Sequence, residues 1–160
     1  MATLNYTGDG GTRPPNVYSQ PNSNIKDAFF YRRLKVADII AADTDMTSNG
    51  YITANDIIQA IDVPAGFLFE GCAVRIITPC TANVNIEVGD NGGAEALASM
   101  DVDAAAGTTK VTIQTDAWAD AEKFFTAADT IDVQFITANC LVGELELFVW
   151  GKLFTLGEAS

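Results

Sequence analysis

The run from Asn55 to Asp90 constrains the fold of this chain more than any other segment. It reads NDIIQAIDVPAGFLFEGCAVRIITPCTANVNIEVGD, in which turn residues interrupt apolar β-forming residues. A Pro-Ala-Gly turn and a Pro-Cys-Thr-Ala loop divide it into three predicted strands, at 56–63, 67–78 and 82–88. The segment carries no nucleophile–base pair and no metal-ligand cluster. It therefore predicts a structural wall of β-sheet and not a pocket.

Alternation of apolar and polar residues extends this prediction to most of the chain. Val84, Ile86 and Val88 share one strand face, which is the period-two pattern of a half-buried strand. Further strands are predicted at 110–115, 130–137 and 143–154, and a weaker one at 29–41 would also suit a helical face. A loop is predicted at 43–51. A long loop is predicted at 89–109, with one helical turn at 94–100. About eight short strands with Gly/Pro punctuation indicate an all-β, two-sheet β-sandwich, with a jelly roll as the natural architecture.

The first 28 residues differ in composition from the remainder. Residues 1–28 are rich in Gly, Pro, Asn, Ser and Thr and contain few large aliphatic side chains. They offer little apolar surface to offset the entropy of ordering, so we expect a flexible or extended N-terminal arm. Residues 29–160 form the predicted sandwich domain. An arm that orders on a partner and a merely frayed terminus both remain open.

Charge is distributed unevenly along the sequence. Residues 1–35 contain five basic and two acidic residues, a net charge of +3. Residues 36–160 contain four basic and nineteen acidic residues, a net charge of −15, which gives −12 for the whole chain. An acidic body repels nucleic-acid phosphates and anionic lipid, so we expect neither nucleic acid nor a membrane as partner. The basic head could still contact an acidic protein surface.

Catalytic and metal chemistry have little support in the composition. The chain has no histidine, which removes the commonest general base and the commonest metal ligand. Its three cysteines, Cys72, Cys80 and Cys140, are odd in number and lack a CxxC spacing, so we expect small buried residues and no disulfide framework. We therefore predict no enzyme activity, no cofactor and no metal site.

One acidic segment allows an alternative. Read as a calcium loop, Asp45–Asp56 places Asp45 at position 1, Asn49 at position 5, Gly50 at position 6 and Asp56 at position 12. Thr47 at position 3 and an Asp in place of the final Glu depart from that pattern. An Asn-Gly turn between strands explains the same residues and is the favoured interpretation.

Aromatic residues suggest where another molecule could bind. Phe148 and Trp150 share the face opposite Leu147 and Val149, so the last strand is apolar on both faces. We predict a subunit interface at Phe148 and Trp150. The alternatives are a carbohydrate platform, which Trp118 could also serve, or a covering segment of the same chain.

The stretch from Asp56 to about Thr109 resembles structural proteins of tailed bacteriophages. The similarity rests on DIIQAIDVPAG, then VNIEVGDNGG, then MDVDAAAGTT, and covers about a third of the chain. Such proteins are commonly capsid decoration (cement) proteins of β-sandwich or jelly-roll fold that act as oligomers. The resemblance implies that Ile61–Gly66 is a scaffold turn and that Val88–Asp90 opens a loop.

The resemblance implies a virion protein that decorates the capsid exterior as a homotrimer, with the major capsid protein as its partner. The residues expected to contact the capsid are Arg13, Lys26, Phe29, Phe30, Tyr31, Arg32 and Arg33. One alternative is a tail or fibre-associated module that binds host carbohydrate. Another is a hydrolase that uses Glu144 and Glu146 as paired carboxylates.

Overall fold

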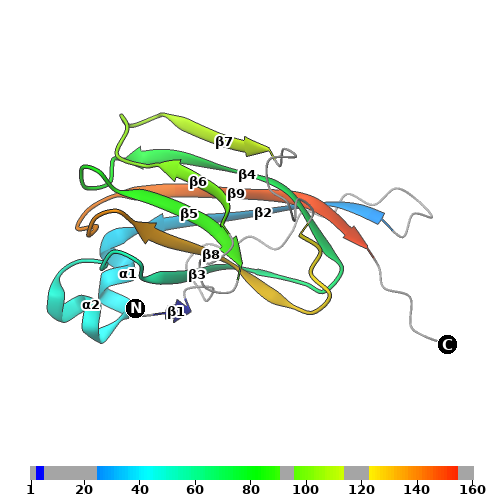
Figure 1. Ribbon diagram of the computed structural model, residues 1–160, viewed down its shortest axis with the longest axis horizontal. Coiled ribbons are helices and arrows are strands. Elements are labelled where there is room, and N and C mark those ends of the chain that lie inside the picture. The colour runs from blue at the N-terminus through cyan, green and yellow to red at the C-terminus, as the bar shows by residue number, and fades with distance from the viewer. Residues whose placement is uncertain (1–2, 6–24, 91–95, 114–122, 155–160) are drawn as a thin grey trace.

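Two β-sheets packed face to face make up the core of the molecule (Figure 1). The computed structural model describes residues 3–5, 25–90, 96–113 and 123–154. The sandwich confirms the predicted all-β fold. In chain order the elements are β1 (Thr3–Asn5), β2 (Ile25–Lys35), α1 (Val36–Ala42), α2 (Thr44–Asn49), β3 (Ile57–Val63), β4 (Phe67–Thr78), β5 (Asn85–Asp90), β6 (Ala96–Asp101), β7 (Thr109–Ile113), β8 (Asp129–Ile136) and β9 (Glu144–Phe154).

One sheet has the strand order β1-β3-β8-β5-β6 and the other has the order β2-β9-β4-β7. Neighbouring strands are antiparallel, apart from the short parallel pair of β1 and β3. From β2 to β5 each successive strand lies in the other sheet, so the chain wraps around the core as it advances. Helices α1 and α2 lie together at one end of the sandwich (Figure 1).

Strand β9 is central to the four-stranded sheet. Its ladder with β2 is unbroken from Ile25 opposite Phe154 to Lys35 opposite Glu144. Its other edge pairs with β4, where the register shifts between Phe69 and Gly71. The sheet is therefore held by pairing between segments that are far apart in the sequence.

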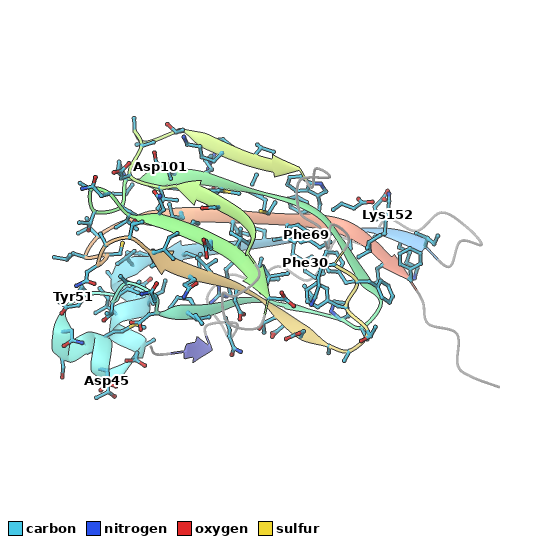
Figure 2. The ribbon with its side chains drawn as sticks, in the orientation of Figure 1. Phe30, Asp45, Tyr51, Phe69, Asp101 and Lys152 are labelled. Atoms are coloured by element: carbon cyan, nitrogen blue, oxygen red, sulfur yellow. The ribbon has the colours of Figure 1, made fainter. Side chains whose placement is uncertain are left out.

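Inward-facing residues of the two sheets form a single hydrophobic core. On β9 every second residue from Leu145 to Gly151 is buried, as the alternation of this strand predicts. Figure 2 shows Phe30 and Phe69 between the two sheets, and both are 2% exposed. The rings of Phe30 and Phe67 pack edge to face with their centroids 5.1 Å apart. Burial of these rings supplies a large share of the apolar surface that drives folding.

Two helices replace the end of the predicted strand and the predicted loop after it. The chain is β-strand only as far as Lys35, because Val36 and Ile39 then turn one helical face into the core. The Asp43 carboxylate caps α2 by accepting from the backbone N–H groups of Asp45 and Met46, both at 2.9 Å. The helix ends at Gly50, which adopts a left-handed conformation with φ of 76°.

The predicted long loop at 89–109 also contains a strand. Strand β5 continues to Asp90, and β6 pairs antiparallel with it, from Asn85 opposite Asp101 to Gly89 opposite Ala96. The predicted helical turn at 94–100 is wrong for residues 96–100, which belong to β6. Residues 94 and 95 lie outside the described part of the chain. Small residues carry a weak period-two signal, and here pairing with β5 decides the conformation.

The boundary of the predicted arm falls inside a strand. Residues 25–28 belong to β2, and Ala28 is buried at 2% exposure. Thr3–Asn5 pairs with Ile57–Gln59 at the edge of the five-stranded sheet. Residues 6–24, which carry most of the arm prediction, lie outside the described part of the chain.

Candidate interaction surface

Four aromatic side chains gather on the solvent side of the four-stranded sheet, which we call the outer face. The β2–β9 register places Phe29 opposite Trp150 and Tyr31 opposite Phe148. The ring centroid of Phe148 is 5.3 Å from that of Tyr31 and 5.9 Å from that of Phe29. Phe29 is 39% exposed and the other three rings are half-buried. Phe29, Tyr31, Phe148 and Trp150 are hereafter the aromatic strip.

The floor beside the aromatic strip is formed by small residues of β4. Ala73 pairs with Phe148, and Gly71 pairs with Trp150, so β4 places no large side chain beside these two rings. Beyond Ala73, Val111 of β7 is 58% exposed. The apolar surface therefore crosses all four strands of the sheet.

A second apolar group continues the outer face toward the end away from the helices. Phe154 pairs with Ile25, and its ring lies edge to face with that of Phe124, with centroids 5.8 Å apart. Phe124 forms an isolated bridge with Leu68 of β4. Ile25 is 44% exposed and Phe124 is 37% exposed. Exposed apolar groups of this extent commonly mark a site of protein contact.

Ion pairs border the aromatic strip on both sides. On one side Arg33 pairs with Glu144, and Arg75 pairs with Glu146 at 2.6 Å. The Tyr31 hydroxyl also donates to Glu146, at 2.9 Å. The hydrogen bond to Glu144 raises the pKa of Arg33, which keeps that guanidinium charged.

On the other side of the strip the ammonium group of Lys152 donates to the carboxylate of Asp27. This hydrogen bond raises the pKa of Lys152, with a further contribution from the charge of Glu70. The aromatic strip is therefore enclosed between two rows of paired charges. An apolar centre with a polar rim is the usual composition of a protein–protein interface.

The outer face is electrically balanced, although the chain as a whole carries −12. Among the described residues of β2, β4 and β9, four bases and four acids lie on this face, so their charges cancel. They are Arg33, Lys35, Arg75 and Lys152, with Asp27, Glu70, Glu144 and Glu146. Another acidic protein can approach this face with less repulsion than it would meet over an acidic surface.

The structure brings together five of the residues predicted from the sequence and separates two others. Phe29, Tyr31 and Arg33 share the outer face with Phe148 and Trp150. The two sites that the sequence predicts separately, for the capsid and for a subunit, are therefore one surface.

Phe30 and Arg32 point to the opposite side of β2 from the aromatic strip. Phe30 is 2% exposed and Arg32 is fully buried, so neither can contact a partner while the sandwich is intact. Lys26 lies on β2 and is partly exposed, and Arg13 lies outside the described residues. We therefore omit Phe30 and Arg32 from the proposed surface.

Sequence reasoning missed the contributions of β4 and β7. Gly71, Ala73 and Val111 complete the surface, and Arg75 balances its charge. The alternation that puts Ala73 and Arg75 on the same face of β4 was the one available signal. Their position beside β9 depends on the strand order, which no local pattern gives.

The other candidate sites have structural explanations. Residues 45–49 are helical, and Asp56 accepts from the backbone N–H of Thr53 at 3.0 Å, so Asp45–Asp56 is a capped helix and a turn rather than a calcium loop. Among the described residues no three Cys, Asp or Glu side chains form a metal cluster. Glu144 and Glu146 are engaged in the ion pairs described above. Trp118 lies outside the described residues.

No helix in the described part of the chain has the length and apolar character needed to cross a bilayer. No protein-family model matches the sequence, and no curated protein matches it either.

Solved structures share the fold at low sequence identity. A chain in the capsid of Ralstonia phage GP4 aligns with a TM-score of 0.61 and 12% identity, over 96% of this chain and 98% of that one. A chain in the acidic stable capsid structure of Helicobacter pylori bacteriophage KHP30 aligns with a TM-score of 0.50 and 11% identity, over 79% and 87%. At such identities the likeness establishes the fold, a β-sandwich that these phage capsids also contain.

Proposed function

We propose that this chain is a structural protein of a bacteriophage virion, and that it coats the outside of the capsid as a homo-oligomer, most simply a homotrimer. The observation that carries this proposal is the aromatic strip on an electrically balanced face. The likeness of the fold to a chain in the capsid of Ralstonia phage GP4 supports the virion setting. The major capsid protein is the proposed partner.

The strand order supports a jelly roll as the finer description of the fold. The orders β2-β9-β4-β7 and β3-β8-β5-β6 account for eight strands in two four-stranded sheets, and β1 adds to the edge of the second. Double-sheet jelly rolls of eight strands are a recurring architecture of viral capsid domains. The fold alone does not imply this function, and the outer face supplies the further support.

We assign the outer face to contact between copies of this chain. Phe29 and Trp150 lie opposite each other, so a partner that covered one would also cover the other. The charged side chains bordering the aromatic strip are already paired within the chain, so the face presents no excess charge to a strongly charged partner. A permanent assembly of this kind is expected to bury at least ~2,000 Å² in total.

Contact with the capsid is assigned to the N-terminal region. Residues 1–35 carry a net charge of +3, with Arg13 and Lys26 among their basic residues. Many copies bound on one shell would convert a modest contact for each copy into high avidity.

The test compares the native mass of the full chain with that of Phe148→Ser/Trp150→Ser, measured by light scattering. We expect an oligomer for the wild type and a monomer for the double variant. Leu141→Ser is the matched control, since Leu141 is 51% exposed in a loop outside the outer face. A wild-type monomer, or a double variant of unchanged mass, would refute the assigned interface.

Mixing each protein with undecorated phage shells tests the capsid role separately. Wild type and Leu141→Ser should coat the shells and the double variant should coat them less densely, because avidity is lost. Failure of every form to bind shells, with oligomerisation intact, would refute decoration while retaining the interface.

A further inference from the structure

Two of the three cysteines meet at the end of the sandwich where the helices lie. Cys80 follows β4 and Cys140 follows β8, and both strands run toward the end of the sandwich at which α1 and α2 lie (Figure 1). The backbone N–H of Cys80 donates to the carbonyl of Val102 at 3.0 Å, and Cys140 forms a two-way bridge with Ile52 at 2.9 Å. Cys80 is 5% exposed and Cys140 is fully buried. Backbone hydrogen bonds therefore hold both cysteines in place, Cys80 through Val102 and Cys140 through Ile52.

The side chains of these cysteines are in direct contact. The Cys80 thiol hydrogen-bonds to the Cys140 sulfur. The residues that follow them are also joined, because the backbone N–H of Leu141 donates to the Thr81 hydroxyl at 2.9 Å. A disulfide requires its two Cβ atoms to lie only ~3.5–4.5 Å apart, so a pair already in thiol contact is close to that geometry.

A glycine makes room for the contact. A Cβ atom built on Gly143 would lie 2.5 Å from the Cys80 sulfur, which is too close for any real side chain. Gly143 also has a φ of 146°, which other residues rarely adopt. As a thiol, Cys140 donates to the carbonyl of Val142 at 3.2 Å. The turn 140–143 therefore wraps around the two sulfur atoms.

We propose that Cys80 and Cys140 form an intramolecular disulfide when the protein meets a small two-electron oxidant such as hydrogen peroxide. Cys140 is the attacking residue once a transient opening of the turn 140–143 admits the peroxide, because the hydrogen bond from Cys80 lowers the pKa of Cys140 and raises that of Cys80. Cys72 takes no part. It lies within β4, and burial raises its pKa to about 12, so it stays a protonated, inert thiol.

The chemistry balances in two steps. The Cys140 thiolate attacks one peroxide oxygen, the O–O bond breaks, and the departing hydroxide takes a proton to become water, leaving a sulfenic acid. The Cys80 sulfur then gives up its proton and attacks the Cys140 sulfur. The S–O bond breaks and a second water leaves, so two thiols and one peroxide give one disulfide and two waters.

Such a crosslink would close a covalent ring that contains the whole segment from Cys80 to Cys140, including β5 to β8. It would reduce the conformational freedom of the unfolded chain, which is how a disulfide stabilises a protein in the loop-entropy account. The crosslink would also fix the turn 140–143, whose Gly143 carbonyl accepts a hydrogen bond at 3.0 Å from the backbone N–H of Val36, the first residue of α1. This inference does not depend on the virion role.

The test is oxidation of the reduced, full-length protein with hydrogen peroxide. Intact mass should fall by two hydrogens, and peptide mapping without reductant should find Cys80 joined to Cys140. The melting temperature should rise by about 5 °C and return on reduction. Cys72→Ser should behave as the wild type, while Cys80→Ser and Cys140→Ser should gain neither the crosslink nor the shift.

A native wild-type map that shows no Cys80–Cys140 peptide would overturn the proposal, as would a crosslink between separate chains or one that includes Cys72. Because this result comes from the wild-type protein, it holds even if a serine variant does not fold.

Discussion

Phe29 of β2 lies directly opposite Trp150 of β9 on the outer face of the four-stranded sheet, although 121 positions separate them in the sequence. The pairing places one residue from the start of the sandwich and one from its last strand on a single apolar surface. A sheet with one face in the core and a second face rich in aromatic side chains needs a further layer. We propose that another copy of the chain supplies it, which makes oligomerisation part of the stability of the fold.

Removing residues 1–24 should leave a folded oligomer that does not coat phage shells. The deletion keeps all of β2 and its ladder with β9, and among the described residues it removes the three-residue pairing of Thr3–Asn5 with β3. A cut at residue 28 would instead remove Ala28 from the core. Circular dichroism, native mass and shell binding measure the three properties. Normal coating by the truncated protein would eliminate the arm as the capsid contact.

Replacing Gly151 with Ala should destabilise the sandwich by about 3 kcal/mol or more. A Cβ there would lie 1.9 Å from the carbonyl oxygen of Leu68, which is backbone and cannot move aside without distorting β4. Urea unfolding gives the free energy of unfolding. Gly107→Ala is the control, because nothing lies within 4 Å of its Cβ position and its φ of 85° alone costs about 1–2 kcal/mol. Equal losses for the two variants would show that the close approach to Leu68 is unimportant.

Asp43→Ala should lower the free energy of unfolding by about 1 kcal/mol, because it removes the side-chain cap of α2. Ser48→Ala lies on an exposed position of the same helix and should stay within about 0.5 kcal/mol of the wild type. Chemical denaturation followed by circular dichroism checks both values. If Asp43→Ala matches Ser48→Ala, then the cap seen at α2 makes no net contribution.

Ionisation of the Cys72 thiol should lower the free energy of unfolding at alkaline pH. Burial raises its pKa from 9.0 to about 12, so the folded state holds the thiol proton more tightly than the unfolded state does. This contribution is complete below pH 9.0 and is lost as the pH rises toward about 12. Cys72→Ala should therefore show a shallower decline of the unfolding free energy across that window. Parallel curves for variant and wild type would mean that Cys72 does not titrate differently on folding.

The sequence predicts strands best where period-two alternation is bounded by turn residues. The predicted strand at 67–78 coincides with β4, and the predicted strand at 143–154 differs from β9 by one residue. Both contain β-branched and aromatic residues at regular positions, so local preference and tertiary packing agree.

Local pattern fails where the tertiary environment decides. Val36 and Ile39 fit a strand or a helix equally well, and their packing against the core at the end of the sandwich selects the helix. Strand β6 consists largely of small residues and forms beside β5. The alternation within β2 does separate Phe29 and Tyr31 from Phe30, but it does not say which set faces the solvent. The buried face of β2 is the one that packs against the five-stranded sheet, and the sequence of β2 does not reveal on which side that sheet lies.

The central position of β9 has a consequence for the order of synthesis and folding. Strands β2 and β4 flank β9 and have no ladder with each other, so the four-stranded sheet has no middle until residues 144–154 have left the ribosome. Before then the apolar inner faces of both strands lack their neighbour, and the nascent polypeptide is vulnerable to aggregation. Assembly of this sheet must therefore be a late event, completed after translation of its final strand.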